Sequence, residues 1–235
     1  MQLSKRLLTC CGFVSPGDRV ADIGCDHGYV SIYLLKNNIA SAVIASDIKE
    51  GPLRSAMQNA DKYGVSDNIR FYLSDGVASI PREFDSLICA GMGGDTMCAI
   101  LEAAPWLRNS QYRLILQCQS KPQMLRQYLS DQGWRIQEET VVRDGRFLYT
   151  IMNVVWQPDF PKLTLGETYF PPALLVNPNA ETGEYYQHLL FSLRRAIAGR
   201  GENADPQMVS ALAELEEMAD TAELHWLKEA PKWQP

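Results

Sequence analysis

Residues 20–34 are the part of the chain that most restricts its fold. An apolar run that ends at Asp22 precedes a turn with Gly24 and Gly28, and a helix-forming stretch follows. This order predicts a buried strand, a tight turn and a helix. Helix N-termini expose unpaired N–H groups, and glycines let a ligand approach the backbone closely. We therefore expect this turn to hold a polar ligand, although similar turns also occur as purely structural links between a strand and a helix.

Three further apolar runs end in acids or glycines, at the positions where a parallel sheet binds ligands. The run 42–47 ends at Asp47, whose carboxylate can accept hydrogen bonds from both hydroxyls of a ribose. The run 69–75 ends at Asp75, where an adenine amino group can bind, and the run 84–90 leads into Gly-Met-Gly-Gly. The carboxyl ends of parallel strands meet at one edge of a sheet, so these groups are predicted to line one crevice.

Acidic residues in the turn indicate which nucleotide-like ligand the crevice takes. A dinucleotide-binding turn has the pattern Gly-x-Gly-x-x-Gly, but this chain has Asp26 and Tyr29 where the later glycines should stand. A carboxylate would repel a pyrophosphate, whereas S-adenosylmethionine has no phosphate and carries an ammonium and a sulfonium. Asp22 and Asp26 are favourable neighbours for those cations. The turn therefore favours S-adenosylmethionine over NAD.

In order and spacing these motifs resemble the TrmK-type tRNA (adenine-N1)-methyltransferases, from the first residues to about Trp156. The resemblance implies an α/β fold of the class I methyltransferase type, with a Rossmann-like, mostly parallel sheet. It also implies S-adenosylmethionine as the methyl donor and methylation at N1 of an adenine, adenine-22, in the D-arm region of tRNA. The matching residues are Ala21-Asp-Ile-Gly-Cys-Asp-His-Gly-Tyr29, Gly51-Pro52, Asp75-Gly76, Ala90-Gly-Met-Gly-Gly94 and Leu114-Ile-Leu-Gln117.

The chain departs from the family pattern at three places. Asp47-Ile48 replaces a Glu-Val pair and keeps the carboxylate. Gln117-Cys118-Gln119 replaces Gln-Pro-Asn at the end of the fifth strand, and Phe170-Pro-Pro172 replaces Phe-Gly-Pro in the tail. The last two differences concern the base pocket and the tail, so the cofactor assignment does not depend on them.

The expected chemistry needs little beyond binding and orientation, because adenine N1 has a lone pair that can attack the sulfonium methyl in line. Methylation makes the base cationic, so a carboxylate facing it would stabilise the product, and Asp26 is the first catalytic candidate. Asp26 could instead bind the cationic methionine end of the cofactor. His27, the second candidate, could bridge to the base, accept a proton or only satisfy backbone groups in the turn.

Other residues are expected to bind the cofactor or the substrate. Tyr29 could stack on a base or only pack on the sheet. Glycines after the fourth strand would let the base approach the methyl group, although a tight turn with Asp95 as helix N-cap also explains them. For the cofactor we expect Asp22, Gly24, Gly28, Asp47, Ile48, Asp75, Gly76, Ala90, Gly91 and Met92, and for the substrate Tyr29, Gly93, Gly94, Arg194, Arg195 and Arg200.

Length and composition are typical of a compact enzyme, which we expect to be a monomer or a weak dimer. The 235 residues can form one sizeable core and a small appendage. No apolar run of about 20 residues is present, so no membrane span is expected. The six cysteines lack the spacing of metal ligands and are expected to be reduced thiols in a cytoplasmic protein without a metal. A net charge of −6 should repel tRNA. Charge is uneven, however, so a local basic face could still form from Lys5 and Arg6 near the N-terminus and from the tail cluster Arg194, Arg195 and Arg200, unless these arginines are only a solvated helix face.

The chain is predicted to divide near residue 158. Residues 1–158 would form the S-adenosylmethionine-binding catalytic domain, which ends in a strand at 113–117 and a hairpin of 134–142 and 147–156 around an Asp-Gly turn. Residues 159–235 would form an irregular connector and an antiparallel pair of helices at 184–198 and 206–228, with a role in tRNA contact implied by the resemblance. Helices of the first domain are expected near 3–12, 28–37, 51–64, 95–104 and 121–132.

Two other functions fit the same motifs. A small-molecule methyltransferase of this fold would use the helical hairpin as a cap over its substrate, and the acidic charge mildly favours it. A binding protein could keep the cofactor crevice without catalysis, because Gln117-Cys118-Gln119 departs from the family.

Overall fold

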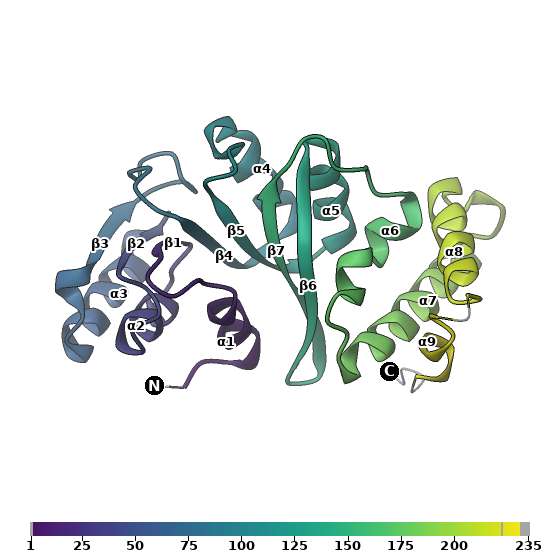
Figure 1. Cartoon of the computed structure of the whole chain (residues 1–235), viewed down its shortest axis with the longest axis horizontal. Helices are drawn as coiled ribbons and strands as arrows, with labels where there is room; N and C mark the ends of the chain where they lie inside the picture. The colour runs from purple at the N-terminus through teal and green to yellow at the C-terminus, as the bar shows by residue number, and fades with distance from the viewer. Residues whose placement is uncertain (1, 222, 231–235) are drawn as a thin grey trace.

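A seven-stranded sheet forms the centre of the structure, a computed structural model that describes residues 2–221 and 223–230 (Figure 1). Strands β3, β2, β1, β4 and β5 are parallel in this spatial order, and β7 and β6 complete the edge with antiparallel pairing. The direction of winding reverses between β1 and β4, the point where open α/β sheets bind ligands. The strands are β1 (Arg19–Ile23), β2 (Ala42–Asp47), β3 (Ile69–Leu73), β4 (Ser86–Gly93), β5 (Arg113–Ser120), β6 (Trp134–Asp144) and β7 (Phe147–Trp156).

Helices cover both faces of the parallel part of the sheet. Successive side chains of a strand point to opposite faces, so Ala21 and Ile23 of β1 join one buried cluster while Val20 joins another. Helices α4 and α5 cover the first cluster, and α1, α2 and α3 cover the second. Burial on both faces explains why the inner strands are nearly continuous apolar runs. The helices are α1 (Lys5–Gly12), α2 (Tyr29–Lys36), α3 (Glu50–Tyr63), α4 (Gly94–Glu102) and α5 (Pro122–Asp131).

The predicted strands are all present, and their ends differ from the prediction in places that matter for the site. Strand β2 has the predicted bounds, β1 continues one residue beyond Asp22, and β4 and β5 each run three residues further than predicted. Strand β4 bulges where its pairing with β5 shifts between Ala90 and Met92. The predicted N-cap role of Asp95 is wrong, because Gly93 holds that position and Asp95, in the first turn of α4, pairs with Lys121 at 2.6 Å.

The hairpin of β6 and β7 is confirmed, and it extends past the rest of the sheet. Asp144 pairs with Phe147, which leaves a two-residue turn in which Gly145 has a φ of 62°. The two turn residues are therefore Gly145 and Arg146, and a positive φ at the first of them is the feature of a two-residue hairpin turn that begins with glycine. Pairing between β5 and β7 stops at Thr150, so the last residues of the hairpin project beyond β5.

The tail contains more helix breaks than the sequence predicted. The connector is not wholly irregular, because a capping box between Thr164 and Glu167 starts a short helix, α6. The second long helix ends at Met218 rather than at residue 228, and Ala222, within the predicted helix, lies outside the described residues. No helix in residues 2–221 and 223–230 is long and apolar enough to cross a membrane. The tail helices are α6 (Leu165–Tyr169), α7 (Ala180–Arg200), α8 (Pro206–Met218) and α9 (Trp226–Glu229).

Helices α7 and α8 form the predicted antiparallel pair. Contacts run in opposite directions along the two helices, from Arg200 with Met208 to Tyr186 with the carbonyl of Leu215. Their facing side chains form a third buried cluster, and Val141 of β6 belongs to it. The tail is therefore packed directly on the β6–β7 hairpin.

Arg126 of α5 ties the tail to the sheet. Its guanidinium donates to both carboxylate oxygens of Glu139 on β6, at 3.0 and 2.6 Å, and both side chains are fully buried. It also donates to the carbonyl oxygens of Thr168 and Tyr169 in α6 and to the hydroxyl of Tyr185 in α7. One buried cation on α5 thus links this helix to β6, α6 and α7.

Candidate functional site

A cavity of about 500 Å³ opens at the carboxyl ends of β1, β2 and β4. It lies where the sheet order reverses, as the spacing of acids and glycines predicts. The structure brings together most of the residues predicted from separate strand ends. Lining residues from the predicted set are Asp22, Gly24, Asp26, His27, Tyr29, Asp47, Ile48, Asp75, Gly76, Ala90, Gly91 and Met92.

The turn after β1 is held tightly against β2. Backbone N–H groups of Gly24 and Cys25 both donate to the carbonyl oxygen of Ser46, at 2.9 and 2.8 Å. Gly24 has a φ of 72°, and a Cβ there would overlap the end of the Met92 side chain. The positive φ therefore favours glycine at this position, and the terminal methyl of Met92 fills the space beside it.

Asp47 connects the two loops that border the cavity. One carboxylate oxygen accepts from the backbone N–H of Asp26 at 3.2 Å, and the other accepts from that of Lys49 at 2.9 Å. The side chain is half-buried and still faces the cavity. Each oxygen has a second lone pair, so the predicted contact with a ribose remains available.

Asp22 is the buried acid of the site. It is 4% exposed, and the hydroxyl of Ser31 donates to its carboxylate at 2.6 Å. Burial raises the pKa of this carboxyl from 3.8 to about 6. At neutral pH the group is therefore a poorly solvated anion on the cavity wall, an environment that attracts a cationic ligand group.

Asp26, His27 and Tyr29 lie at the mouth of the cavity and are exposed. The His27 Nε2 atom is 3.7 Å from a carboxylate oxygen of Asp26, and the rings of His27 and Tyr29 are 5.9 Å apart. Asp26 has a φ of 50°, a left-handed conformation that is unusual for a residue other than glycine. The strained backbone at Asp26 thus lies in the segment that exposes these side chains to solvent.

Arg6 of α1 is a cavity residue that the sequence motifs did not reveal. Its Nη1 donates to the amide oxygen of Gln117 at 2.6 Å, and the N–H of Gly91 donates to the same oxygen at 3.1 Å. Gly91 has a φ of 84°, so this shared acceptor stabilises the bulge at the end of β4. No local pattern marks Arg6, because its partners are on strands far along the chain. Other lining residues outside the predicted set are Leu7, Ile23, Cys25, Val30, Lys49, Pro52, Ser74, Thr96, Ile100 and Gln119.

Three of the predicted glycines lie outside the cavity lining, and close packing explains each. A Cβ at Gly28 would lie 2.9 Å from that of Ala56, so this glycine lets α2 begin against α3. At Gly94 a Cβ would lie 2.7 Å from the carbonyl oxygen of Lys121, and at Gly93 it would lie 3.0 Å from Ser120 Oγ. None of these three glycines lines the cavity, so no contact there supports their predicted roles in binding the cofactor or the base.

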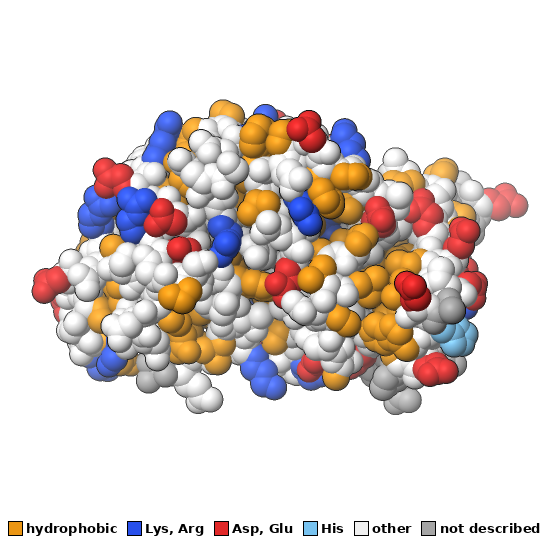
Figure 2. All heavy atoms as spheres, in the orientation of Figure 1, with side chains coloured by type: hydrophobic (Ala, Val, Ile, Leu, Met, Phe, Trp, Pro, Cys, Tyr) orange, Lys and Arg blue, Asp and Glu red, His pale blue; other side chains and the backbone are white. Residues whose placement is uncertain are grey.

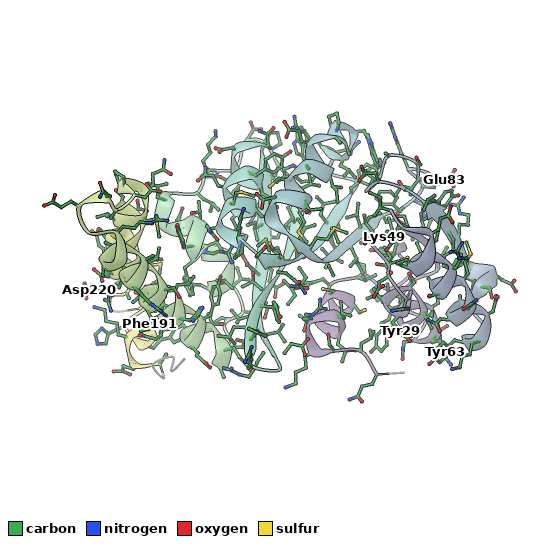
Figure 3. The ribbon with its side chains drawn as sticks, turned by 180° about the vertical axis from the view of Figure 1, so that it is seen from behind. Tyr29, Lys49, Tyr63, Glu83, Phe191 and Asp220 are labelled. Atoms are coloured by element: carbon green, nitrogen blue, oxygen red, sulfur yellow. The ribbon has the colours of Figure 1, made fainter. Side chains whose placement is uncertain are left out.

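The three tail arginines are exposed and belong to α7, not to the cavity. Tyr29 and Lys49 of the cavity lie toward one end of the molecule, and Phe191 and Asp220 of the tail lie at the other (Figure 3). Arg194 is already paired with Glu216 of α8 at 2.6 Å. Any contact of these arginines with a substrate would therefore be remote from the reacting groups.

In the part of the chain that the structure describes, no three His, Cys, Asp or Glu side chains lie close enough together to hold a metal ion. The six cysteines are free thiols. Burial raises the pKa of Cys11 and of Cys89 to about 12, so both are protonated at neutral pH.

Residues 3–152 match the family model described as a methyltransferase domain. The chain belongs to this methyltransferase family. The match contains every residue that lines the cavity, from Arg6 to Gln119. The methyltransferase domain therefore includes the whole site, and the tail helices lie beyond the matched segment.

Named relatives agree with this assignment. The chain is 33% identical over 153 residues to the tRNA (adenine(22)-N(1))-methyltransferase of Bacillus subtilis, a match that covers 65% of this chain and 64% of that protein. The crystal structure of the B. subtilis M1A22 tRNA methyltransferase TrmK superposes with a TM-score of 0.76 at 28% identity, covering 97% of this chain and 98% of that one. The resemblance to the TrmK-type family is confirmed, together with the class I methyltransferase fold.

A Streptococcus pneumoniae protein crystallised with S-adenosyl-L-methionine superposes with a TM-score of 0.79 at 29% identity. The superposition covers 92% of this chain and 99% of that one. The tail helices are therefore part of the shared architecture, although the family model does not reach them.

Proposed function

We propose that this chain transfers a methyl group from S-adenosylmethionine to N1 of an adenine in tRNA, with adenine-22 in the D-arm region as the target. The observation that carries the proposal is the group of carboxylates of Asp22, Asp26 and Asp47 in one cavity at the carboxyl edge of the sheet. A cationic ligand suits this cavity. The named B. subtilis matches are tRNA methyltransferases, and the S. pneumoniae protein was crystallised with S-adenosyl-L-methionine. A cytoplasmic location and a monomer or weak dimer are part of the same proposal.

The residues present fit S-adenosylmethionine. The cofactor supplies a methyl group on a positively charged sulfur. Asp22 would attract the cationic amino acid end, because its buried carboxylate lacks a cationic partner among the ion pairs of the described residues. Asp47 would accept from the ribose hydroxyls, and Asp75 with Gly76 would border the adenine.

Asp26, His27 and Tyr29 would contact the target base. The carboxylate of Asp26 is 69% exposed at the mouth, and its own backbone, not its carboxylate, is bound to Asp47. An exposed carboxylate there can face the 6-amino edge of adenine and stabilise the positive charge that the base gains. Tyr29 is 40% exposed and can stack on the base. His27, beside Asp26, can orient it or accept a proton from the 6-amino group of the cationic, methylated base.

A methylation assay on paired transcripts tests the proposal. Purified protein, labelled S-adenosylmethionine and an unmodified tRNA with adenine at position 22 should give labelled tRNA, and the same transcript with guanine at position 22 should stay unlabelled. Mass spectrometry of the digested product should show 1-methyladenosine. If the label appears in molecules of a small-molecule extract but not in tRNA, the protein is a small-molecule methyltransferase and the proposal is wrong. If the protein binds the cofactor but transfers no methyl group, it is a binding protein.

A further inference from the structure

The tip of the β6–β7 hairpin lies at the same edge of the sheet as the cavity. Both β5 and β6 are antiparallel to β7, so β6 runs in the direction of β5 and its end at Asp144 is at the carboxyl edge. The hairpin continues beyond the last pair of β5 with β7, at Cys118 and Thr150. Its tip therefore projects past the strand ends that form the cavity.

Arg6 links this tip to the cavity directly. It lines the cavity, its Nε is 3.5 Å from a carboxylate oxygen of Asp144, and its guanidinium lies 5.9 Å from the ring centre of Tyr149. Tyr149 and Phe147 are two residues apart on β7 and so face the same side, with ring centres 6.2 Å apart. A row of planar groups thus leads from the cavity wall to the tip.

The outer end of this row is open to solvent and positively charged. Phe147 is 52% exposed, and the guanidinium of Arg146 lies 4.9 Å from its ring centre. Nearby cations are neutralised, since Arg143 pairs with Glu184 and Arg6 with Asp144. Within residues 2–221 and 223–230, Arg146 has no ion-pair partner.

Charge is divided unevenly between residues 180–235 and the rest of the chain. Residues 180–235 contain ten acidic and five basic residues, whereas residues 1–179 contain 18 acidic and 17 basic ones. Acidic side chains gather over the tail helices on the face shown in Figure 2. A polyanion is therefore repelled by the tail helices and approaches the nearly neutral part of the chain, residues 1–179, where the tip offers an unpaired cation.

We propose that the hairpin tip, Arg146 and Phe147, is the surface on which the RNA strand next to the target nucleotide docks. Phe147 stacks on an unpaired base, Arg146 contacts a phosphate, and the row through Tyr149 to Arg6 leads the strand into the cavity. Aromatic faces combined with cations are how proteins hold single-stranded nucleic acid without reading its sequence. This inference rests on the proposed tRNA substrate, and it assigns the packed tail the role of bracing the hairpin through Val141 and Glu184.

The test compares two double variants with the same chemistry. Arg146→Ala/Phe147→Ala removes the tip. Arg135→Ala/Phe160→Ala is the matched control, because Arg135 also lies over an aromatic ring, at 4.4 Å from the centre of Phe160. That pair is near the amino end of β6, about 30 Å along the strand from the tip. Filter binding of unmodified tRNA at several salt concentrations, steady-state methylation and calorimetry with S-adenosylmethionine are measured on both variants and on the wild type.

The tip variant should bind tRNA about ten- to a hundredfold more weakly, with a log–log salt slope lower by about one. Its KM for tRNA should rise, while kcat at saturating tRNA and cofactor affinity stay within about twofold of wild type. The control should match wild type. Unchanged tRNA affinity and salt slope in the tip variant would overturn the inference, and a simultaneous change from dimer to monomer would identify the tip as a contact between copies of this chain. A wild-type protein that neither binds nor methylates tRNA would instead remove the proposed function.

Discussion

The guanidinium of Arg6 lies 2.6 Å from the amide oxygen of Gln117, although 111 residues separate them in the chain. The same oxygen accepts from the N–H of Gly91, and the amide nitrogen of Gln117 donates to the carbonyl of Cys118. Gln117 is fully buried. One side chain thus joins the first helix, the bulge in β4 and the end of β5 at the wall of the cavity.

Replacing Gln117 by leucine should therefore lower both stability and cofactor affinity. The change removes the acceptor of the partly buried N–H of Gly91 and of the half-buried guanidinium of Arg6, which costs about 1–3 kcal/mol in the free energy of unfolding. Relaxation of the Gly91 bulge should then weaken S-adenosylmethionine binding. Urea unfolding and calorimetry measure the two effects. Gln111→Leu, in an exposed loop, is the control, and equal urea midpoints for the two variants would show that the shared oxygen is dispensable.

Asp22 should lower the free energy of unfolding of the cofactor-free protein as the pH rises toward 6. Its pKa is about 6 in the folded protein and 3.8 ordinarily, so between these values the unfolded chain loses a proton that the folded protein keeps. Stability falls over that window and the loss is complete above about pH 6. Asp22→Asn can still accept from Ser31, and we expect it to be more stable than wild type by about 2–3 kcal/mol at pH 8. Urea unfolding at pH 8 with no gain would contradict the burial effect.

The same variant should bind S-adenosylmethionine poorly. In the wild type, affinity should fall as pH drops below about 6, because protonated Asp22 no longer attracts the cationic end of the cofactor. Asp22→Asn should show weak binding without this pH step. Calorimetry at pH 5 and pH 8 measures both proteins, and a step that persists in the variant would assign the titration to another group.

Asp26→Asn should separate catalysis from cofactor binding. The Asp26 carboxylate is exposed at the mouth of the cavity. In contrast, Asp22 is buried, and the carboxylate of Asp47 accepts from backbone N–H groups of the two bordering loops. We expect single-turnover methylation to fall by about ten- to a thousandfold, the scale of losing one electrostatic stabiliser, with cofactor affinity nearly constant. Asp67→Asn, an exposed acid in the short 3-10 helix before β3, is the control. Equal losses in rate and in affinity would make Asp26 a cofactor ligand.

Strand ends were the part of the site that the sequence predicted well, for a physical reason. In a parallel sheet buried on both faces, apolar runs define the strands, and the first acid or glycine after each run falls at the ligand-binding edge. Asp47, which ends β2 as predicted, and Asp75, two residues beyond β3, both line the cavity on this basis. Long-range contacts such as that of Arg6 with Gln117 leave no periodic signal in the sequence, so only the structure could reveal them.

The errors in the tail come from competing local signals. Prolines near residue 160 predicted an irregular connector, yet Thr164 and Glu167 form a capping box that starts α6. Apolar spacing continued past Met218 and predicted a longer helix, although the chain turns there before α9. Gly93 and Gly94 fit a substrate role by position alone; their close approach to the loop before α5 also accounts for glycine there, so the substrate role stays a prediction.

Arg126 and Glu139 should be indispensable singly and replaceable together. Arg126→Met leaves the buried carboxylate of Glu139 without its partner, which should cost about 3–5 kcal/mol in the free energy of unfolding. Arg126→Met/Glu139→Leu removes both charges and should recover most of that loss. Urea unfolding of the single and double variants completes the cycle, and a double variant no more stable than the single one would mean that the carbonyls of α6 depend on Arg126 instead.

The three tail arginines should contribute little to RNA binding. Contacts with three phosphates would lower the log–log salt slope by about two to three in the variant Arg194→Ala/Arg195→Ala/Arg200→Ala. Arg194 is neutralised by Glu216, and the surrounding helices are acidic, so we expect a change below about one unit. Filter binding across a salt series, beside the tip variant Arg146→Ala/Phe147→Ala, ranks the two surfaces on one scale. A fall of two to three units in the tail variant with none in the tip variant would place the tRNA on α7, and the hairpin tip would then serve only to close the cavity.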